Sequence, residues 1–288
     1  MDTKNIYNCY YKESSCGIGD FLRGSVFLKQ ALDQVGINFD IDFTFHPISK
    51  FLTTPSVVDY KVDDIIDIEK ESKKDPAKYL QNLRTHTEKV LNLNQSSIFL
   101  LTNYSDCIFL HPLEFAKIGI SQQAAEFFIS RLKFTKEVYD SLDELNLPSK
   151  YNAVHFRCGD YELVRGGSGG DKRNNTDYKI DYYECLRKLD NIDNPVILAD
   201  SNKLKSFLEE QGYKIGHKNS QHSAINPGSV NSIEYQDDKM LHVCLDMLIM
   251  SRANSIQTYS VYPWFSGFSF WTAKIHNVPI YNNMIGNI

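Results

Sequence analysis

An imidazole, a guanidinium and a carboxylate lie close together in the segment His155-Phe-Arg-Cys-Gly-Asp160, which begins inside a run of strand-forming residues. An arginine at the end of such a strand presents a planar fork of N–H donors, which suits a diphosphate. Asp160 could then orient Arg157 or the loop that follows it. The alternative is a buried histidine beside a strand-end salt bridge, and spacing alone does not decide between the two interpretations.

Three other segments have polar groups where a strand is expected to give way to a helix. The turn Gly17-Ile-Gly19 could let backbone N–H groups approach an anion at a helix N-terminus, although a tight turn also favours glycine. Asp200 follows an apolar strand and could face a ligand or simply cap the next helix. The segment from Ser260 to Trp271 combines hydroxyls with many aromatic residues, so it could cradle a phosphate or pack a core.

Strands and helices alternate in both halves of the sequence, and this alternation would bring those segments together. In the first half, strands are expected at 5–11 and 37–45, around a helical run that ends near Gly36. In the second half, strands are expected at 151–156, 195–199 and 254–259, with helices at 181–189, 201–211, 237–252 and 264–276. The pattern predicts an α/β protein with two facing, doubly wound Rossmann-like domains, whose ligands bind at the carboxyl ends of parallel strands. The proline in Leu147-Pro-Ser-Lys150 predicts the boundary between domain 1–149 and domain 150–288.

The composition disfavours several classes of protein. The 288 residues carry a net charge of −5, which is unlike a dedicated duplex nucleic-acid binder. No apolar run approaches the roughly 20 residues that cross a bilayer, and the N-terminus lacks the apolar core of a signal peptide, so a cytoplasmic protein without a membrane span is expected. The six cysteines and eight histidines show no metal-ligand spacing, so no metal site is predicted. Asp40 and Asp42 imitate the DxD motif of metal-dependent transferases, but the alternating strand around them predicts a solvated face.

The order of these motifs resembles that of the α-1,2-fucosyltransferases and of the wider fucosyltransferase group, which includes the α-1,6- and protein O-fucosyltransferases. Their motif H-x-R-R-G-D-Y is similar to His155-Phe-Arg-Cys-Gly-Asp-Tyr161. Further segments match in the same order: GGLGNQ with 16–21, a tyrosine-rich helix start with 181–183, SDD with 199–201, DLYLMS with 245–251 and NSSFSWW with 265–271. The resemblance is good across about 150–275 and thin in 37–120, where acceptor recognition would lie.

The resemblance implies a GT-B fold and an inverting, metal-independent transfer of fucose from GDP-fucose to a glycan hydroxyl, without a cofactor. The first domain would be mainly the acceptor side, and the second would bind the donor. Arg157 would stabilise the leaving β-phosphate in place of a metal, and Asp246 would position the guanosine or the arginine. The donor-binding residues so implied are Gly17, Gly19, His155, Arg157, Asp200, Asp246, Ser266 and Ser269.

Two departures from the family pattern leave the donor open. Cys158 stands where the family has its second arginine, and Asp20 stands where it has an asparagine. Arg23 or Arg165 could supply the missing cation. The alternatives are therefore a related transferase that uses another nucleotide sugar, such as a UDP-sugar, and a non-catalytic glycan- or nucleotide-binding module on the same fold. The expected partners are a nucleotide sugar and a glycan acceptor, with no nucleic acid.

An inverting displacement benefits from a base that faces the acceptor hydroxyl. Asp20 ranks first because it comes from the acceptor-side domain. Glu162 ranks second because it adjoins a glycine-rich loop that could close over an acceptor, and Asp160 ranks third because it would tie down the arginine loop. Asp20 could instead be the N-cap of the helix that begins near Phe21. The expected catalytic residues are therefore Arg157, Asp20, Glu162 and Asp160.

Overall fold

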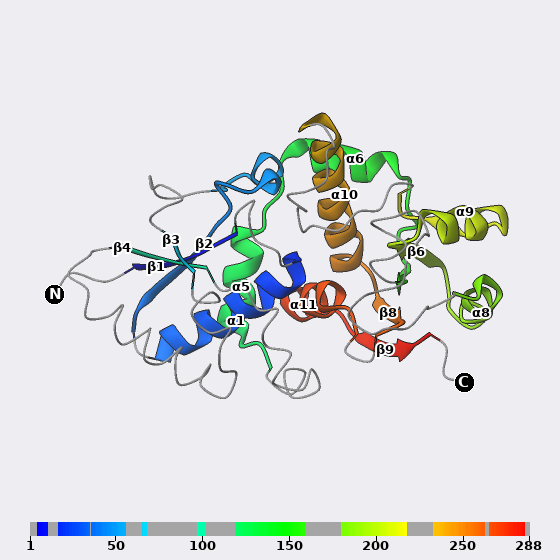
Figure 1. The fold of residues 1–288 in the computed structure, drawn as a ribbon. Helices are drawn as coiled ribbons and strands as arrows, with labels where there is room; N and C mark the ends of the chain where they lie inside the picture. Colours follow the sequence, from blue (N-terminus) through cyan, green and yellow to red (C-terminus); the bar gives the residue numbers. More distant parts are fainter. Residues whose placement is uncertain are drawn as a thin grey trace. The chain divides into compact units, whose positions relative to one another are not determined.

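The computed structural model describes residues 5–10, 17–34, 36–55, 65–67, 97–101, 119–158, 180–217, 233–262 and 265–285. Contacts divide the chain into two compact units, with the described residues up to Lys133 in the amino-terminal unit and those from Phe134 in the carboxy-terminal unit. Each unit contains a parallel sheet with helices packed against it (Figure 1). The predicted α/β architecture is therefore confirmed in both halves.

The amino-terminal unit is built on a four-stranded parallel sheet in the order β2-β1-β4-β3. Its described elements are β1 (Asn5–Cys9), α1 (Ile18–Gln34), β2 (Asn38–Asp42), the 3-10 helix η1 (Pro47–Phe51), β3 (Ile65–Asp67), β4 (Ser97–Leu101) and α5 (Gln122–Arg131). Phe21, Leu28 and Leu32 form the buried face of α1, which packs against β2, as their helical spacing predicts. The helix ends at the expected glycine. Gly36 adopts a φ of 68°, and the N–H of Ile37 donates to the carbonyl of Leu32 at 3.0 Å.

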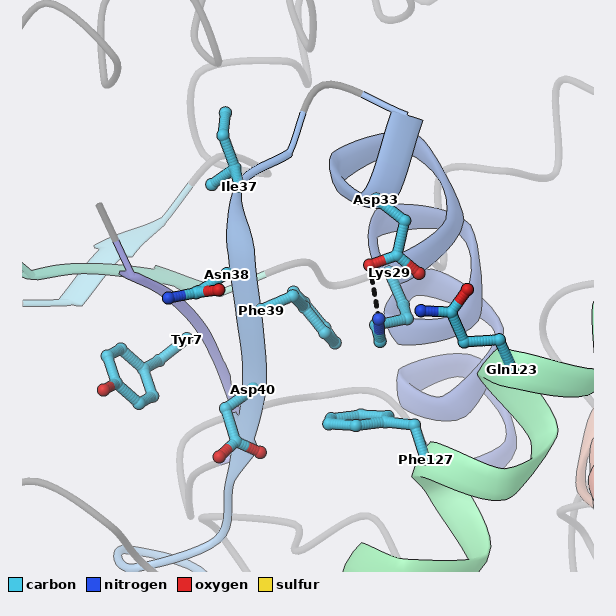
Figure 2. A pocket seen from close by; sticks show the side chains of 9 residues that line it. All are labelled: Tyr7, Lys29, Asp33, Ile37, Asn38, Phe39, Asp40, Gln123 and Phe127. Carbon is cyan, nitrogen blue, oxygen red and sulfur yellow. Dashed lines mark hydrogen bonds and ion pairs between the residues drawn. The ribbon is translucent and has the colours of Figure 1, made fainter. Parts of the chain in front are cut away.

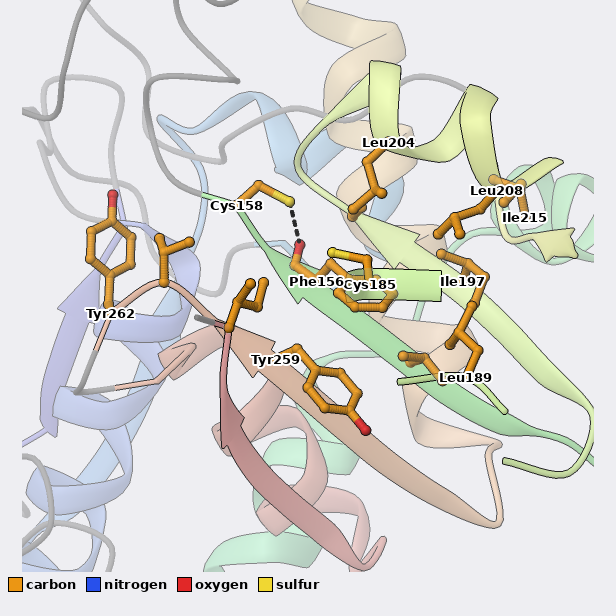
Figure 3. Packing of buried hydrophobic residues seen from close by; sticks show 14 residues of the cluster. Phe156, Cys158, Cys185, Leu189, Ile197, Leu204, Leu208, Ile215, Tyr259 and Tyr262 are labelled. Atoms are coloured by element: carbon orange, nitrogen blue, oxygen red, sulfur yellow. Dashed lines mark hydrogen bonds between the residues drawn. The ribbon is translucent and has the colours of Figure 1, made fainter. Parts of the chain in front are cut away.

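The carboxy-terminal unit is built on a five-stranded parallel sheet in the order β7-β6-β5-β8-β9. Its described elements are α6 (Lys136–Glu144), β5 (Asn152–Arg157), α8 (Tyr182–Arg187), β6 (Pro195–Ala199), α9 (Asn202–Glu210), β7 (Lys214–Ile215), α10 (Ile233–Ser251), β8 (Ser255–Ser260), α11 (Gly267–His276) and β9 (Ile280–Met284). Phe156 and Ile197 pack with Leu204 of α9 in the apolar cluster of Figure 3. His155, which precedes Phe156 on β5, contacts α11 instead. Successive residues of a strand point to opposite faces, so helices cover both faces of this sheet.

The division between the units lies earlier in the chain than the sequence predicts. Helix α6 packs against α10, and the guanidinium of Arg252 lies 5.5 Å from the ring of Tyr139 in α6. The division therefore falls between residues 133 and 134 rather than between 149 and 150. The proline at 148 marks only the connection from α6 to β5, because packing between helices determines which unit holds α6.

The predicted solvated face of Asp40 and Asp42 is wrong. The side chain of Asp42 is 1% exposed, and it accepts hydrogen bonds from the backbone N–H and the hydroxyl of Thr44 at 2.9 and 3.2 Å. Asp40 accepts a hydrogen bond from Nε of Arg131 at 2.6 Å. Burial raises the pKa of Asp40, and the charge of Arg131 partly offsets this effect. Both carboxylates therefore hold local structure together within the amino-terminal unit.

Candidate functional site

The carboxyl ends of the parallel strands in the carboxy-terminal unit gather polar side chains at one edge of its sheet. Strand β5 ends at Arg157, Asp200 directly follows β6, His217 follows β7, and β8 ends at Ser260. The chain continues from β5 to α8 on one face, and from the neighbouring β8 to α11 on the other. Neighbouring strands whose connections leave to opposite faces mark the place where open α/β sheets bind ligands.

Arg157 is held by an ion pair at this edge. Its Nη1 donates to Oδ2 of Asp200, and its guanidinium carbon lies 5.5 Å from the centre of the Tyr262 ring. Burial by itself lowers the pKa of Arg157, but the charges of Asp200 and Tyr262 more than reverse this effect and raise it. The guanidinium therefore stays protonated and oriented, which is the state that a phosphate requires.

Asp200 orients the end of β5 and does not cap α9. Its Oδ1 accepts a hydrogen bond from the backbone N–H of Cys158 at 2.5 Å, while Oδ2 binds Arg157. The N-cap of α9 is Ser201, whose hydroxyl accepts from the N–H of Leu204 at 3.2 Å. The alternative that Asp200 is only a helix cap is therefore wrong, because the carboxylate turns toward β5 and the next residue performs the capping.

His155 lies beside the serines that precede and begin α11. Its Nδ1 forms a hydrogen bond with the hydroxyl of Ser269, and Ser266 is the N-cap of the same helix. The Ser266 hydroxyl accepts from the N–H of Ser269 at 3.4 Å. Burial lowers the pKa of His155, so the imidazole is neutral at pH 7 and takes part as a hydrogen-bonding group rather than as a cation.

The turn into α11 contains a conformation that is unusual for its residue. Phe265 precedes the N-cap and has a φ of 60°, the left-handed region that a bulky side chain rarely adopts. Its N–H donates to the carbonyl of Tyr262 at 3.2 Å, which ties the turn to the residue that stacks on Arg157. Strained backbone conformations of this kind cluster at functional sites.

A second polar cluster adjoins the first and joins α9, β7 and α10. Oδ1 of Asp246 lies 2.6 Å from Nε2 of His217, and Nζ of Lys205 donates to the carbonyl of His217 at 2.8 Å. The His217 ring stacks on that of His242, with centroids 4.6 Å apart and planes 5° apart. Burial raises the pKa of Asp246, but His217, Lys205 and His155 together outweigh it and lower the pKa. Asp246 is thus an oriented carboxylate at pH 7.

Lys205 and His217 are not among the site residues predicted from the sequence. Lys205 adjoins Leu204 on the first turn of α9, so it resembles an ordinary surface lysine in the sequence. His217 follows a strand of only two residues, which produces no apolar run. The local signal in the sequence is the glycine before His217, and the structure shows why Gly216 is needed there. A Cβ there would lie 2.5 Å from Cδ2 of Leu198 and 3.0 Å from Cδ1 of Ile249. The glycine lets the chain approach β6 closely and brings His217 to Asp246.

The predicted glycine turn lies in the amino-terminal unit and begins α1. The carbonyl of Gly17 accepts from the N–H groups of Asp20 and Phe21 at 3.0 and 3.1 Å, so Gly17 is at the N-cap position. Gly19 lies within the first turn of the helix and is buried. Ile18 and Gly19 therefore carry the first N–H groups of the helix, and an anion bound at this turn would contact N–H groups of this kind.

Asp20 is neither a cap nor an isolated carboxylate. It lies in the first turn of α1, and its Oδ1 is 3.0 Å from Nη2 of Arg23. The alternative that Asp20 is the N-cap is therefore wrong, because the helix begins two residues before it. Arg23, one of the two cations proposed to replace the family's second arginine, is paired with Asp20 in the amino-terminal unit. The other, Arg165, lies outside the described residues, as do Asp160 and Glu162.

A hollow of about 370 Å³ opens in the amino-terminal unit, near the carboxyl end of α1 (Figure 2). Lys29 of α1 pairs with Asp33 and lies 5.2 Å from the ring of Phe127. The lining residues are Tyr7, Lys29, Asp33, Ile37, Asn38, Phe39, Asp40, Gln123 and Phe127. None of these is a predicted site residue, and Lys29 follows Gly17 by 12 residues of helix, or roughly 18 Å. The hollow and the glycine turn are separate features of this unit.

Within the described ranges, no group of three or more His, Cys, Asp or Glu side chains is arranged to hold a metal ion. None of the helices described is both long and apolar enough to cross a membrane.

The comparisons with known proteins rest on structure rather than on sequence. No protein-family model matches the chain, and no curated protein matches it in sequence. NodZ α-1,6-fucosyltransferase soaked with GDP-fucose is 13% identical, with a TM-score of 0.53 over 96% of this chain and 94% of that one. The same enzyme co-crystallised with GDP is 13% identical, with a TM-score of 0.51 over 94% and 92%. Fucosyltransferase NodZ from Bradyrhizobium is 13% identical, with a TM-score of 0.53 over 94% and 93%. Similarity over nearly the whole of both chains establishes the architecture: this chain has a fucosyltransferase-like GT-B fold.

Proposed function

We propose that this protein is an inverting glycosyltransferase that moves fucose from GDP-fucose to a glycan hydroxyl without a metal ion. The observation that carries the proposal is the largely buried Arg157–Asp200 pair at the carboxyl edge of a parallel sheet. The fold of the chain is shared with a protein whose structure was determined after soaking with GDP-fucose. A fold alone does not specify an activity, so the proposal depends on the side chains at this edge.

In the proposed reaction, the acceptor oxygen attacks C1 of fucose while the bond from C1 to the β-phosphate oxygen breaks. The electron pair of that bond leaves with GDP, and Arg157 stabilises the negative charge that develops on the diphosphate. His155, Ser266 and Ser269 add uncharged hydrogen-bonding groups at the start of α11, where helix N–H groups favour an anion. Asp246, oriented by His217, binds the nucleoside part of the donor.

The proton of the acceptor hydroxyl must go to a base, and we assign this role to Asp20. Its side chain is 37% exposed, and its partner Arg23 keeps the carboxylate oriented. Glu162 and Asp160 are the next candidates in that order. In the amino-terminal unit, the backbone N–H groups of Gly17 and Gly19 are the proposed ligands for an anion.

Stabilisation by nucleotides tests the proposal directly. A ligand that binds the folded state increases the free energy of unfolding, by about 2.7 kcal/mol at a ligand concentration of 100 Kd. The melting temperature therefore rises. We expect GDP to stabilise the protein and UDP to have little effect. Stabilisation by UDP and not GDP would identify a different donor, and stabilisation by neither would support a non-catalytic module. With GDP binding established, release of GDP from GDP-fucose in the presence of glycan acceptors measures the transfer.

A further inference from the structure

The edge of the carboxy-terminal sheet contains two carboxylates beside the place proposed for a diphosphate. Asp200 has Arg157 as its cationic partner. Among the described residues, the hydrogen-bonding partner of Asp246 is an imidazole, that of His217. A buried carboxylate repels the phosphates of a donor unless another charge balances it, and such repulsion is strong where water is excluded. The site therefore needs a second cation.

Lys205 has the position and the surroundings of that cation. Its side chain is 2% exposed, although lysine is almost never fully buried without a partner. Its Nζ donates to the carbonyl of His217, the residue whose ring binds Asp246. The negative charges of Asp246 and Asp200 both act on the amine and favour its protonated form. Lys205 thus lies in the field of both carboxylates while touching the residue that orients one of them.

The packing of α9 determines where Lys205 lies, although burying its ammonium group is unfavourable. Leu204 and Leu208 anchor α9 in the apolar cluster of Figure 3, and Ser201 caps the helix, so the position of residue 205 is determined by packing. Taking an ammonium group out of water is unfavourable, and a methionine of similar length would avoid this penalty. A buried charge that the core does not need indicates a role at the site beside it.

We propose that Lys205 is a positioning residue that supplies the second cation among the described residues of the donor site, balancing Asp200 and Asp246 so that a nucleoside diphosphate can bind. This inference rests on the function proposed above. A unit charge about 8–10 Å from a phosphate changes the affinity roughly 15- to 30-fold at an effective dielectric constant near 20. Loss of Lys205 should therefore weaken diphosphate binding by about this factor.

The inference also predicts how the affinity depends on pH. Burial lowers the pKa of Lys205 to about 8, an effect that Asp246 and Asp200 partly offset. A bound diphosphate favours the charged amine, so its affinity is highest below this pKa and falls as the pH rises through it. Linkage gives a loss of about tenfold between pH 7 and pH 9. Among the described residues, the ionisable groups near the amine are His155 of β5, Asp200 after β6, His217 after β7 and Asp246 of α10.

Calorimetric titration with GDP at pH 7, 8 and 9 tests the inference, using wild type, Lys205→Met and the matched control Lys203→Met. Lys203 is exposed on the same helix, so its replacement changes the net charge equally without touching the cluster. We expect Lys205→Met to bind GDP at least tenfold more weakly at pH 7 and to lose the pH dependence. The control should follow wild type at every pH.

Two results would overturn the inference alone: GDP affinity of wild type that stays constant from pH 7 to 9, or a folded Lys205→Met variant that matches the control. The wild-type titration decides the question even if Lys205→Met does not fold. If wild type binds GDP at none of these pH values, the proposed function is wrong and the inference falls with it.

Discussion

Replacing Arg157 by Gln separates the structural role of this residue from its chemical role. The substitution removes the cation and leaves the carboxylate of Asp200, which is 8% exposed, without its ion-pair partner. Removing one member of a buried pair typically costs 3–5 kcal/mol. Asp200 keeps the N–H of Cys158 at 2.5 Å and remains in the field of Lys205, so we expect a smaller loss of about 2–3 kcal/mol in the free energy of unfolding. For a protein of this size, that loss corresponds to a fall of roughly 5–10 °C in melting temperature.

Two further variants complete the comparison. The double variant Arg157→Gln/Asp200→Asn removes both charges. Its loss in the free energy of unfolding should therefore be about 2 kcal/mol smaller than the summed losses of the two single variants. GDP binding should not recover, because the proposed phosphate ligand is still absent. Arg187→Gln is the matched control, since Arg187 pairs with Asp181 at 3.7 Å and the two side chains are 65% and 55% exposed. A pair of this kind contributes less than about 1 kcal/mol.

Thermal unfolding followed by circular dichroism gives the stabilities, and calorimetric titration gives the GDP affinity of each variant. A loss of stability in Arg157→Gln no larger than in the control would refute the structural argument. A double variant that binds GDP as well as wild type would refute the assignment of Arg157 to the diphosphate.

Three other predictions address the remaining features. Gly216→Ala should lower the free energy of unfolding by about 1–3 kcal/mol, because the added methyl group would lie 2.5 Å from Cδ2 of Leu198. Gly119→Ala is the control, because a Cβ there would meet no atom within 4 Å, and it should change the free energy of unfolding far less in the same denaturation experiment. Asp20→Asn should change the free energy of unfolding by less than about 1 kcal/mol, since the pair with Arg23 is partly exposed. If Asp20 is the base, the same variant should reduce turnover at saturating substrates about 100-fold or more. Near-normal turnover would show that Asp20 is not the base. Treatment with EDTA should leave most of the transfer activity intact, and activity that disappears with EDTA and returns with manganese would contradict a metal-independent reaction.

The alternation of strands and helices, and the residues that end the strands, could be predicted from the sequence. Apolar periodicity and glycine positions are local properties, so α1 and its end at Gly36 follow from them directly. Arg157 and Asp200 could be expected at one edge because parallel strands place their carboxyl ends together, and the structure brings their side chains into contact. The roles of these residues in binding and transfer stay predictions.

Which side chains are buried, and what they contact, depends on tertiary packing that the sequence pattern does not show. Ser201 rather than Asp200 caps α9, and Asp42 is buried rather than solvated. Lys205 is also buried, although its sequence context is that of a surface residue. Helix α6 likewise belongs to the carboxy-terminal unit, where it packs on α10. Each of these outcomes depends on contacts between segments far apart in the chain, whose free energies exceed the weak preferences that neighbouring residues express.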